Sequence, residues 1–391
     1  MGFAISLACV MAAQKAPPRV SVAQLLAQDL TWTQQQRETR FAHMDTVFPV
    51  NRIRHGPALA LTQGDPLPVR LPSGESVDAF MQRDRLAGVL VMQHGRIRFE
   101  RYALGASPKT TWTSFSMTKS VTATLVGYAI RDGLIQSADD KVTRYIPELA
   151  GSAYDGVTVQ QLADMTSGVR WVEDYSAPDS DNVKLYEATA PKGRDLVVEY
   201  MRKLPREAAP GTKFVYKTGE TDLLGVLVRR AVGTSLSTYT ERTLWREMGA
   251  ASDAFWIADD GKEFGGSGLS ATLQDFGRLG EFVRAHRANG SPLGLWLAAA
   301  TRGEADGGRY GLGWWTFPDL GRTQADPSGD ESFAALGIFG QSILVDPKRE
   351  LVIVTLGAWP QATNPGLVAD RAALWDAVRR GIDASSPDPV R

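Results

Sequence analysis

Residues 113–130 read TSFSMTKSVTATLVGYAI, and this segment carries the clearest chemical pattern in the chain. Ser116 precedes Lys119 by three positions, and an almost wholly apolar run follows. Residues three apart lie on one face of a helix, so a helix over 117–132 would bring the hydroxyl and the amine together. Gly133 is its expected C-terminal cap. The segment therefore predicts a helix that begins at a serine–lysine pair.

A serine beside a lysine can act as a nucleophile if the lysine takes its proton. A serine hydroxyl alone is a weak nucleophile, and a buried lysine amine loses its own proton more readily than an exposed one. The backbone N–H of Ser116, at the start of the helix, could also stabilise a developing oxyanion. A surface lysine after a serine N-cap shows the same S-x-x-K spacing, so this pattern alone leaves both interpretations open.

Length and composition limit the number of lobes and the class of protein. The 391 residues predict about two lobes. Hydrophobic residues make up 43% and charged residues 22% of the chain, with a net charge of −1, which is ordinary for a soluble globular protein. We expect a small-molecule substrate and no nucleic acid, because the chain has no polybasic segment. We also expect no membrane span.

Cysteine and histidine usage argues against metals. Cys9 is the only cysteine, which excludes a disulfide and a cysteine-based zinc site. The four histidines lie far apart and form no H-E-x-x-H pattern, so no metal or other cofactor is expected. Residues 3–13 are apolar like the core of a secretion signal, but no basic residue precedes them. We expect a cytoplasmic protein and leave export to the periplasm open.

The hydrophobic pattern divides the chain into three parts. Residues 1–75 form an N-terminal extension, a partial signal followed by a wrapping segment without periodicity. Residues 76–135 and 300–385 are expected to form an α/β lobe around an antiparallel sheet flanked by helices. Residues 136–299 are expected to form a mainly helical lobe inserted into it. The predicted class is α+β, with the site in a cleft between the lobes.

Turn residues and periodicity predict the individual elements. A hairpin is expected over 87–105, with its turn at His94-Gly95. The other clear elements are helices over 222–233, 272–290 and 367–380, and strands over 309–317, 333–347 and 350–358.

A second motif lies in PGTKFVYKTGETDLLGVLVRRAVG, residues 210–233. Tyr216 would be held on a loop before a helix that begins near Asp222. A tyrosine beside a lysine cation loses its proton more readily, so Tyr216 could relay a proton between Ser116 and a leaving group. An ordinary loop tyrosine with a packed ring is the alternative.

A third motif is the segment FAALGIFGQ, residues 333–341. Gly337 would let a substrate approach the strand edge closely. The next backbone N–H, that of Ile338, would then be the second oxyanion donor. Loss of one such donor typically lowers the rate by roughly 100- to 1000-fold.

These three motifs, in this order, resemble the serine β-lactamase and penicillin-binding-protein superfamily, with the closest similarity to its class C β-lactamase-like branch. Three further segments are similar to the family as well: VTVQQLADMTSGV (157–169), GGSGLSATLQDFGRLG (265–280) and YGLGWW (310–315). The resemblance spans roughly residues 75–380 and implies a β-lactamase/transpeptidase-like fold.

The resemblance also implies roles for single residues. Ser116 would be the acylated nucleophile, Lys119 its base partner and Tyr216 the proton relay. The backbone N–H groups of Ser116 and Ile338 would form the oxyanion hole.

Two motifs depart from the pattern of most penicillin-recognising members. The Tyr-x-Asn motif reads Tyr216-Lys217-Thr218, and the Lys-Thr-Gly motif reads Ala335-Leu336-Gly337. The lysine of the second motif normally meets the β-lactam carboxylate. Ala335 cannot do so, which argues against an efficient β-lactamase or transpeptidase.

The 6-aminohexanoate-dimer (nylon-oligomer) hydrolases and related esterases are a better local match. GIFGQ (337–341), followed by Asp346-Pro347, and DYSAP (174–178) are similar to segments of those enzymes. Their tyrosine in the second segment closes over the substrate amide. By resemblance, Tyr175 and Gly337 would bind the substrate, and Tyr175 would stabilise the departing amine; an exposed loop aromatic is the alternative for Tyr175.

The sequence thus implies a serine hydrolase that cleaves an ester or a linear amide through an acyl-enzyme on Ser116, without a cofactor. Two alternatives remain: a β-lactamase or DD-peptidase acting on cell-wall-type substrates, and a non-catalytic penicillin-binding-like scaffold. The sequence leaves open the physiological substrate, the preference for ester or amide, and whether the protein forms a homodimer.

Overall fold

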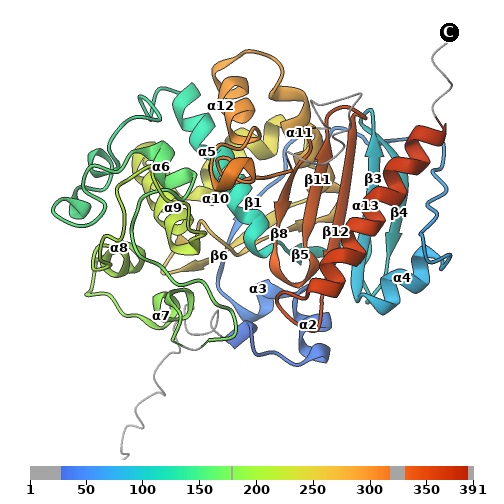
Figure 1. The fold of residues 1–391 in the computed structure, drawn as a ribbon, viewed down its shortest axis with the longest axis horizontal. Helices are drawn as coiled ribbons and strands as arrows, with labels where there is room; N and C mark the ends of the chain where they lie inside the picture. Colours follow the sequence, from blue (N-terminus) through green and yellow to red (C-terminus); the bar gives the residue numbers. More distant parts are fainter. Residues whose placement is uncertain (1–27, 178, 318–330, 386–391) are drawn as a thin grey trace, which may run out of the picture.

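A large sheet is the framework of the protein in the computed structural model, which describes residues 28–177, 179–317 and 331–385 (Figure 1). Its strands lie in the order β2 (Thr62–Gln63), β4 (Arg96–Tyr102), β3 (Leu86–Gln93), β12 (Leu351–Gly357), β11 (Ser342–Asp346), β10 (Phe333–Leu336) and β9 (Trp315–Thr316). β2 runs parallel to β4, and the other neighbours are antiparallel. The sheet therefore joins the two ends of the chain, as the sequence predicts.

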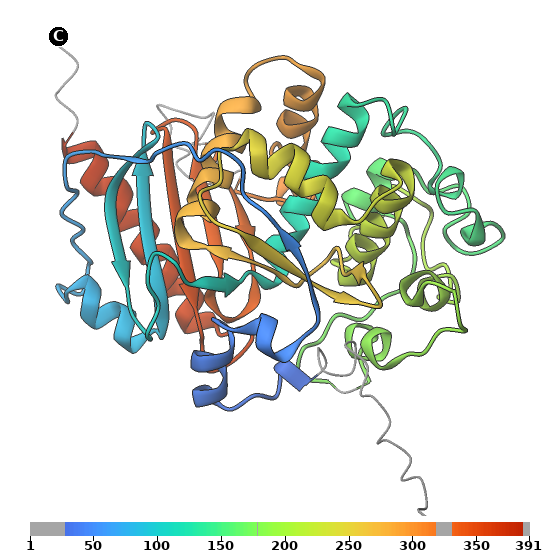
Figure 2. The same cartoon turned by 180° about the vertical axis from the view of Figure 1, so that it is seen from behind.

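The central strands are apolar on both faces because helices cover the sheet from two sides. Every residue of β3 and β12 is buried. α13 (Pro365–Ser385) crosses one face (Figure 1), and α11 (Leu273–His286) packs against β3, β11 and β12 on the other (Figure 2). Gly277 brings α11 close to the sheet, since a Cβ there would lie 2.6 Å from Leu90 Cδ2.

A second, smaller sheet was not predicted from the sequence. β1 (Val50–Ile53), β6 (Ala254–Asp259), β8 (Leu269–Thr272) and β5 (Thr111–Thr113) pair antiparallel in this order, and β7 (Lys262–Glu263) pairs with β6. β5 leads directly into the segment that holds Ser116. This sheet therefore anchors the start of the helix that follows.

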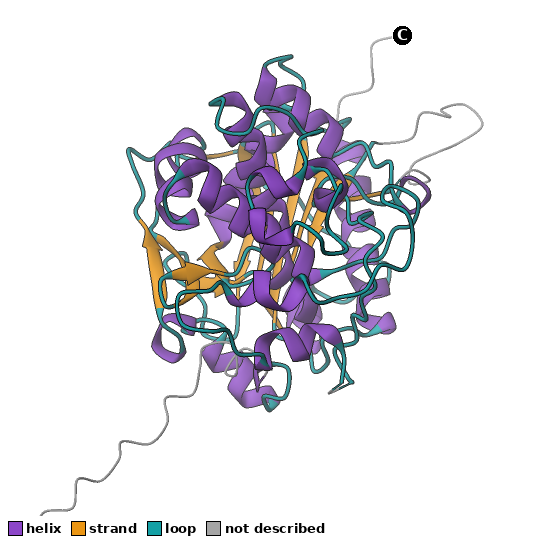
Figure 3. Cartoon of the chain, turned by 90° about the vertical axis from the view of Figure 1, so that its left-hand side faces the viewer, coloured by secondary structure: helices purple, strands orange, loops and turns teal. Residues whose placement is uncertain are grey.

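The remaining helices lie mostly to one side of the large sheet, as the view from that side shows (Figure 3). They are α2 (Gln34–Arg40), α3 (Met44–Val47), α4 (Val77–Arg83), α5 (Thr118–Arg131), α6 (Val159–Ala163), α7 (Asp181–Glu187), α8 (Leu196–Met201), α9 (Thr218–Val232), α10 (Leu236–Thr240) and α12 (Pro292–Ala300). α5 is buried from Thr118 to Ala129 and packs against α9 and α12. α5 therefore runs through the interior of the molecule, with Lys119 in its first turn and Ser116 two residues before its start.

Several predicted elements are confirmed. β3 and β4 form the expected hairpin, and its turn residues His94 and Gly95 both have positive φ angles, of 51° and 71°. α5 spans the predicted helix, and Gly133 follows it in the left-handed conformation, at φ 70°. The expected α+β class is confirmed as well.

Two predicted strands are wrong in extent. Residues 333–347 do not form one strand, because Phe339 and Gly340 have φ angles of 61° and 97° and reverse the chain, so that β10 pairs with β11. Of residues 309–317, only Trp315–Thr316 is a strand. The preceding residues turn back at Gly313, where φ is 78°, and Tyr310 forms isolated bridges with Ala305 and Trp315.

The division into lobes remains a prediction. α11 belongs by sequence to the predicted helical lobe, yet it packs on the large sheet. The predicted signal segment lies outside the described residues, and the location of the protein also stays a prediction. Within the described ranges, none of the helices combines the length and apolar character needed to cross a membrane.

Candidate active site

The segment before α5 presents Ser116 in an unusual backbone geometry. Phe115, in a short 3₁₀ turn (Phe115–Met117), has a φ of 44°, which costs free energy for a residue with a side chain. Its ring is held between Phe41 and Phe339, with centroid distances of 5.0 and 5.3 Å. These aromatic contacts stabilise a conformation that places Ser116 at the mouth of the helix.

Lys119 lies directly behind Ser116. Its Nζ is 2.9 Å from Ser116 Oγ, and it donates a hydrogen bond of 2.9 Å to the Gly266 carbonyl oxygen. The side chain is 1% exposed. Among the described residues it forms no ion pair, so both of its hydrogen-bonding partners are neutral oxygens. The hydroxyl and the amine therefore lie together at the start of α5, as their three-residue spacing predicts.

Gly266, whose carbonyl oxygen accepts from Lys119, also contacts the buried carboxylate of Asp222. Asp222 Oδ1 accepts a 2.7 Å hydrogen bond from the Gly266 N–H, and Tyr186 donates to its other oxygen at 3.3 Å. Burial raises the pKa of Asp222 to about 6, although the Gly266 hydrogen bond and the charge of Lys119 oppose the shift. Gly266 has no room for a side chain, because a Cβ would lie 2.9 Å from the Thr218 carbonyl oxygen.

Tyr216 closes the other side of the lysine. The Lys119 Nζ lies 5.2 Å from the centre of the Tyr216 ring, within cation–π range. The ring stacks on Trp315 at 5.5 Å and meets Tyr310 edge-on at 6.0 Å. α9 begins at Thr218, earlier than the sequence predicts, so Tyr216 lies just before the first turn of the helix.

The backbone around Tyr216 is fixed by one carbonyl group. The Met165 oxygen accepts from the Val215 N–H and from Lys217 Nζ, both at 3.2 Å, and so holds the two neighbours of Tyr216. Lys217 also forms a 3.5 Å ion pair with Glu220, and both side chains are fully buried. Sequence reasoning noted Lys217 only as part of a lost Tyr-x-Asn pattern.

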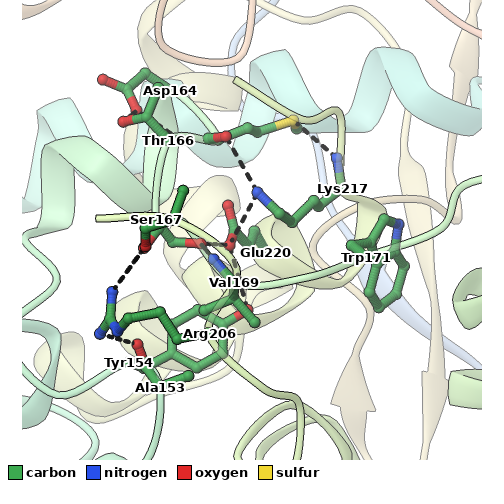
Figure 4. Close-up of polar contacts among 12 residues, drawn as sticks. Ala153, Tyr154, Asp164, Thr166, Ser167, Val169, Trp171, Arg206, Lys217 and Glu220 are labelled. Carbon is green, nitrogen blue, oxygen red and sulfur yellow. Dashed lines mark hydrogen bonds and ion pairs between the residues drawn. The ribbon is translucent and has the colours of Figure 1, made fainter. Parts of the chain in front are cut away.

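Glu220, the ion-pair partner of Lys217, accepts hydrogen bonds from two buried hydroxyl groups. One of its oxygens accepts from the hydroxyls of Tyr154 and Ser167, while the other has no hydrogen-bond partner in the part of the chain that the structure describes (Figure 4). Burial raises the pKa of Glu220, and Lys217 and the two hydroxyls oppose that shift. The positive charge of Lys217 therefore offsets the cost of burying the Glu220 carboxylate.

Tyr175 lies at the rim of the site, on the loop after Trp171. Its hydroxyl donates to Glu173 at 2.8 Å, and Glu173 also accepts from Trp171 Nε1 and from the N–H and hydroxyl of Thr218. Burial and the neighbouring carboxylate of Glu173 raise the pKa of Tyr175 well above its usual range. The hydroxyl hydrogen is thus engaged, which leaves the phenol oxygen as an acceptor.

A cleft of about 350 Å³ brings most of the predicted residues together. It is lined by Ser116, Glu173, Tyr175, Tyr216, Trp315, Leu336, Gly337, Ile338, Trp359, Ala362, Thr363, Val368 and Arg371. A narrower cavity of about 50 Å³ adjoins Ser116, Tyr175 and Ile338. Of the predicted site residues, only Lys119 is absent from the lining, because it is buried behind Ser116.

A protein-family model and a curated relative match most of the chain. The family model described as Beta-lactamase matches residues 75–374. The chain belongs to the beta-lactamase family. A curated relative, the 6-aminohexanoate-dimer hydrolase of Paenarthrobacter ureafaciens, is 30% identical over 376 residues, which cover 88% of this chain and 91% of that protein. Family and relative together make this beta-lactamase-family member a hydrolase.

Solved structures confirm the β-lactamase/transpeptidase-like fold. A putative 6-aminohexanoate-dimer hydrolase from Bacillus anthracis has a TM-score of 0.75 at 19% identity, and the match covers 89% of this chain and 94% of that one. A class C beta-lactamase has a TM-score of 0.57 at 19% identity, covering 80% and 95%. The family resemblance stated from the sequence motifs is confirmed by the family model and the curated relative.

The third family motif is shaped by close backbone packing in this beta-lactamase-family member. A Cβ at Gly337 would lie 2.5 Å from the Ser114 carbonyl oxygen. The glycine therefore lets its backbone pass close to the segment that holds Ser116. The buried side chain of Gln341, after the turn, links the motif to β12. Its Nε2 donates to the Gly357 carbonyl oxygen at 2.7 Å, and its Oε1 accepts from the Gly357 N–H at 3.0 Å. Together these contacts set the position of Ile338 at the cleft.

Sequence reasoning assigned no role to five charged residues around the site: Glu173, Lys217, Glu220, Asp222 and Arg371. Only Lys217 and Glu220, three positions apart, gave a local signal. The described residues contain no cluster of three or more side chains suited to binding a metal. The expectation that this family member needs no cofactor stays a prediction.

Proposed function

We propose that this beta-lactamase-family hydrolase cleaves an ester or a linear amide through an acyl-enzyme on Ser116. The observation that carries the proposal is the 2.9 Å contact between Lys119 Nζ and Ser116 Oγ at the base of the cleft. A serine needs a base within hydrogen-bond reach to become a nucleophile. Among the described residues no carboxylate forms an ion pair with Lys119, so its nitrogen is free to exchange a proton with the hydroxyl.

In the acylation step, Ser116 Oγ attacks the substrate carbonyl carbon while its proton passes to Lys119. The negative charge that develops on the carbonyl oxygen is taken up by the backbone N–H groups of Ser116 and Ile338. Collapse of this intermediate breaks the bond to the alcohol or amine, which receives a proton through Tyr216. The acyl group is then attached to Ser116 by an ester bond.

Deacylation reverses these proton transfers with water as the nucleophile. Water gives a proton to the pair of Lys119 and Tyr216 and attacks the acyl carbon. The bond to Ser116 Oγ breaks, and the serine takes the proton back as the carboxylic acid leaves. The net reaction consumes one water and requires no cofactor.

The rim of the cleft supports action on amides as well as esters. The Tyr175 hydroxyl donates to Glu173, so its oxygen can accept the N–H of a substrate amide. The relative named 6-aminohexanoate-dimer hydrolase supports a linear amide as substrate. Ala335 is fully buried in β10 and offers no cation, which disfavours the β-lactamase alternative.

Turnover by wild type and Ser116→Ala on one substrate panel tests the proposal. The panel contains p-nitrophenyl acetate and butyrate, the 6-aminohexanoate linear dimer and nitrocefin. We expect wild type to hydrolyse the esters or the dimer far faster than nitrocefin, and Ser116→Ala to be inactive. Nitrocefin as the preferred substrate would favour the β-lactamase alternative, and equal activity of the two proteins would overturn the role of Ser116.

A further inference from the structure

Four hydrogen-bond donors converge on the carboxylate of Glu173, which lines the cleft. One of its oxygens accepts from the hydroxyls of Tyr175, at 2.8 Å, and of Thr218. The other oxygen accepts from Trp171 Nε1 and, at 3.0 Å, from the Thr218 backbone N–H. These two N–H groups can only donate, so the atom that they face must be an acceptor. A carboxylate accepts through both of its oxygens and therefore suits all four contacts.

This arrangement fixes the direction of the Tyr175 hydrogen bond. A phenol has a single hydrogen to donate, and Tyr175 keeps that hydrogen because burial and the charge of Glu173 raise its pKa well above the usual range. The hydrogen points to Glu173, so the lone pairs of the Tyr175 oxygen remain for the cleft. Tyr175 therefore presents an acceptor to a bound substrate.

The cleft that Tyr175 lines is also the place for the leaving group. In the proposed reaction the leaving group receives its proton through Tyr216. Tyr216 lines the cleft, and the described residues around the narrower cavity beside Ser116 do not include it. The leaving group should thus occupy the cleft, on the same side as Tyr175. At that place an amide carries an N–H group, whereas an ester carries an oxygen with lone pairs.

We propose that Glu173 is a positioning residue that favours amides over esters, because it holds Tyr175 as the hydrogen-bond acceptor for the N–H of the scissile amide. An ester brings its oxygen against the same lone pairs, and neither oxygen then supplies a hydrogen. Glu173 acts through Tyr175 and need not touch the substrate. This inference rests on the proposed hydrolase function and deepens it by naming the residue that sets the preferred bond.

Glu173→Gln should reverse this hydrogen bond. The glutamine oxygen suits the two N–H donors, from Trp171 and Thr218, so the glutamine NH₂ group would face the two hydroxyls. Tyr175 would then accept from the glutamine and turn its own hydrogen toward the cleft. The matched substrates are p-nitrophenyl butyrate and butyryl-p-nitroanilide, which form the same acyl-enzyme, so the ratio of their kcat/KM values reports acylation. We expect the ratio of anilide to ester to fall roughly tenfold.

Further variants separate this effect from a structural role of the carboxylate. Tyr175→Phe removes the acceptor and should lower the same ratio by a similar factor. The double variant Glu173→Gln/Tyr175→Phe should have the ratio of Tyr175→Phe alone, because Glu173 acts through Tyr175. Glu187→Gln, a change at an exposed glutamate of α7, is the control and should match wild type.

The ratio is insensitive to partial unfolding, because a smaller folded fraction lowers both rates equally. Equal losses on the ester and the anilide in Glu173→Gln would therefore assign a purely structural role to Glu173 and overturn the inference. A further fall of the ratio in the double variant would overturn it as well, since Glu173 would then act independently of Tyr175.

A binding measurement separates this inference from the hydrolase proposal. In a Ser116→Ala background, calorimetry should show that butyranilide binds about fivefold more tightly than phenyl butyrate, and Glu173→Gln should remove the difference. Equal binding of the two compounds before that change would overturn the inference even if wild type hydrolyses both substrates. The expected binding difference without any turnover by wild type would keep the role of Glu173 and reject the proposed function.

Discussion

The amine nitrogen of Lys119 lies 2.9 Å from the hydroxyl oxygen of Ser116 and forms no ion pair with any described residue. A lysine that is 1% exposed and has only neutral oxygens as hydrogen-bonding partners is rare in a protein, because burial of its charge is costly. The fold keeps it there through α5, which is buried along nearly its whole length. This relationship is the basis of the proposed reaction.

Removal of the Lys119 amine should abolish most of the activity. Lys119→Met keeps the length of the side chain but cannot take the Ser116 proton, so kcat/KM for p-nitrophenyl butyrate should fall by about 10²- to 10⁴-fold. Lys213→Met is the control, because Lys213 is exposed and, of the residues that the structure describes, pairs with Glu207 alone, at 2.7 Å. Activity of Lys119→Met within tenfold of wild type would contradict the role of this amine.

The hydroxyl of Tyr216, and not its ring, should carry its function. Tyr216→Phe keeps the stacking on Trp315 and should lower kcat by roughly 100-fold. Tyr310→Phe is a matched control from the same aromatic cluster, since the buried Tyr310 hydroxyl has no hydrogen-bond partner among the described residues. It should leave kcat unchanged. Equal losses in both variants, measured under saturating ester, would assign the effect to ring packing.

The buried ion pair beneath Tyr216 should determine stability. Lys217→Met leaves the Glu220 carboxylate buried without its cation, and we expect a loss of about 3 kcal/mol in the free energy of unfolding. The double variant Lys217→Met/Glu220→Gln removes both charges and should regain part of that loss. Urea unfolding of wild type and the two variants measures this. A double variant no more stable than Lys217→Met would show that the charge of Glu220 is not the cause.

The buried acid Asp222 should make stability depend on pH. Its pKa is raised from 3.8 to about 6 in the folded protein, so the folded state holds this proton more tightly than the unfolded state. Its contribution to stability is therefore full below about pH 4 and is lost as the pH rises to about 6. The neighbouring charged or titratable groups are Lys119, Glu173 and Tyr186.

Asp222→Asn cannot titrate and keeps an oxygen acceptor for the Gly266 N–H. The stability of Asp222→Asn relative to wild type should thus increase by about 3 kcal/mol between pH 4 and 6, at 1.4 kcal/mol per pKa unit, and then level off. Urea unfolding of both proteins from pH 4 to 8 measures the difference. A difference that does not change with pH would mean that Asp222 titrates normally in the folded protein.

Local patterns predicted the parts of the site that depend on neighbours in sequence. The three-residue spacing of Ser116 and Lys119 fixes their contact once α5 forms, and the ordered motifs led to Tyr216, Gly337 and Ile338. The second sheet was not predicted, because β1 pairs with a strand about 200 positions away and its register leaves no local trace. The position of Arg371 was equally hidden, since only the fold places it in the lining of the cleft beside Ser116.

The most direct test of the account is the mass of the protein after reaction with a fluorophosphonate probe. Intact-mass analysis followed by peptide mapping should show one adduct on wild type, located on the peptide that contains Ser116. Ser116→Ala should remain unlabelled, and Lys119→Met should label far more slowly. An adduct on Ser116→Ala, or ester hydrolysis by a wild-type protein that the probe does not label, would contradict an acyl-enzyme on Ser116.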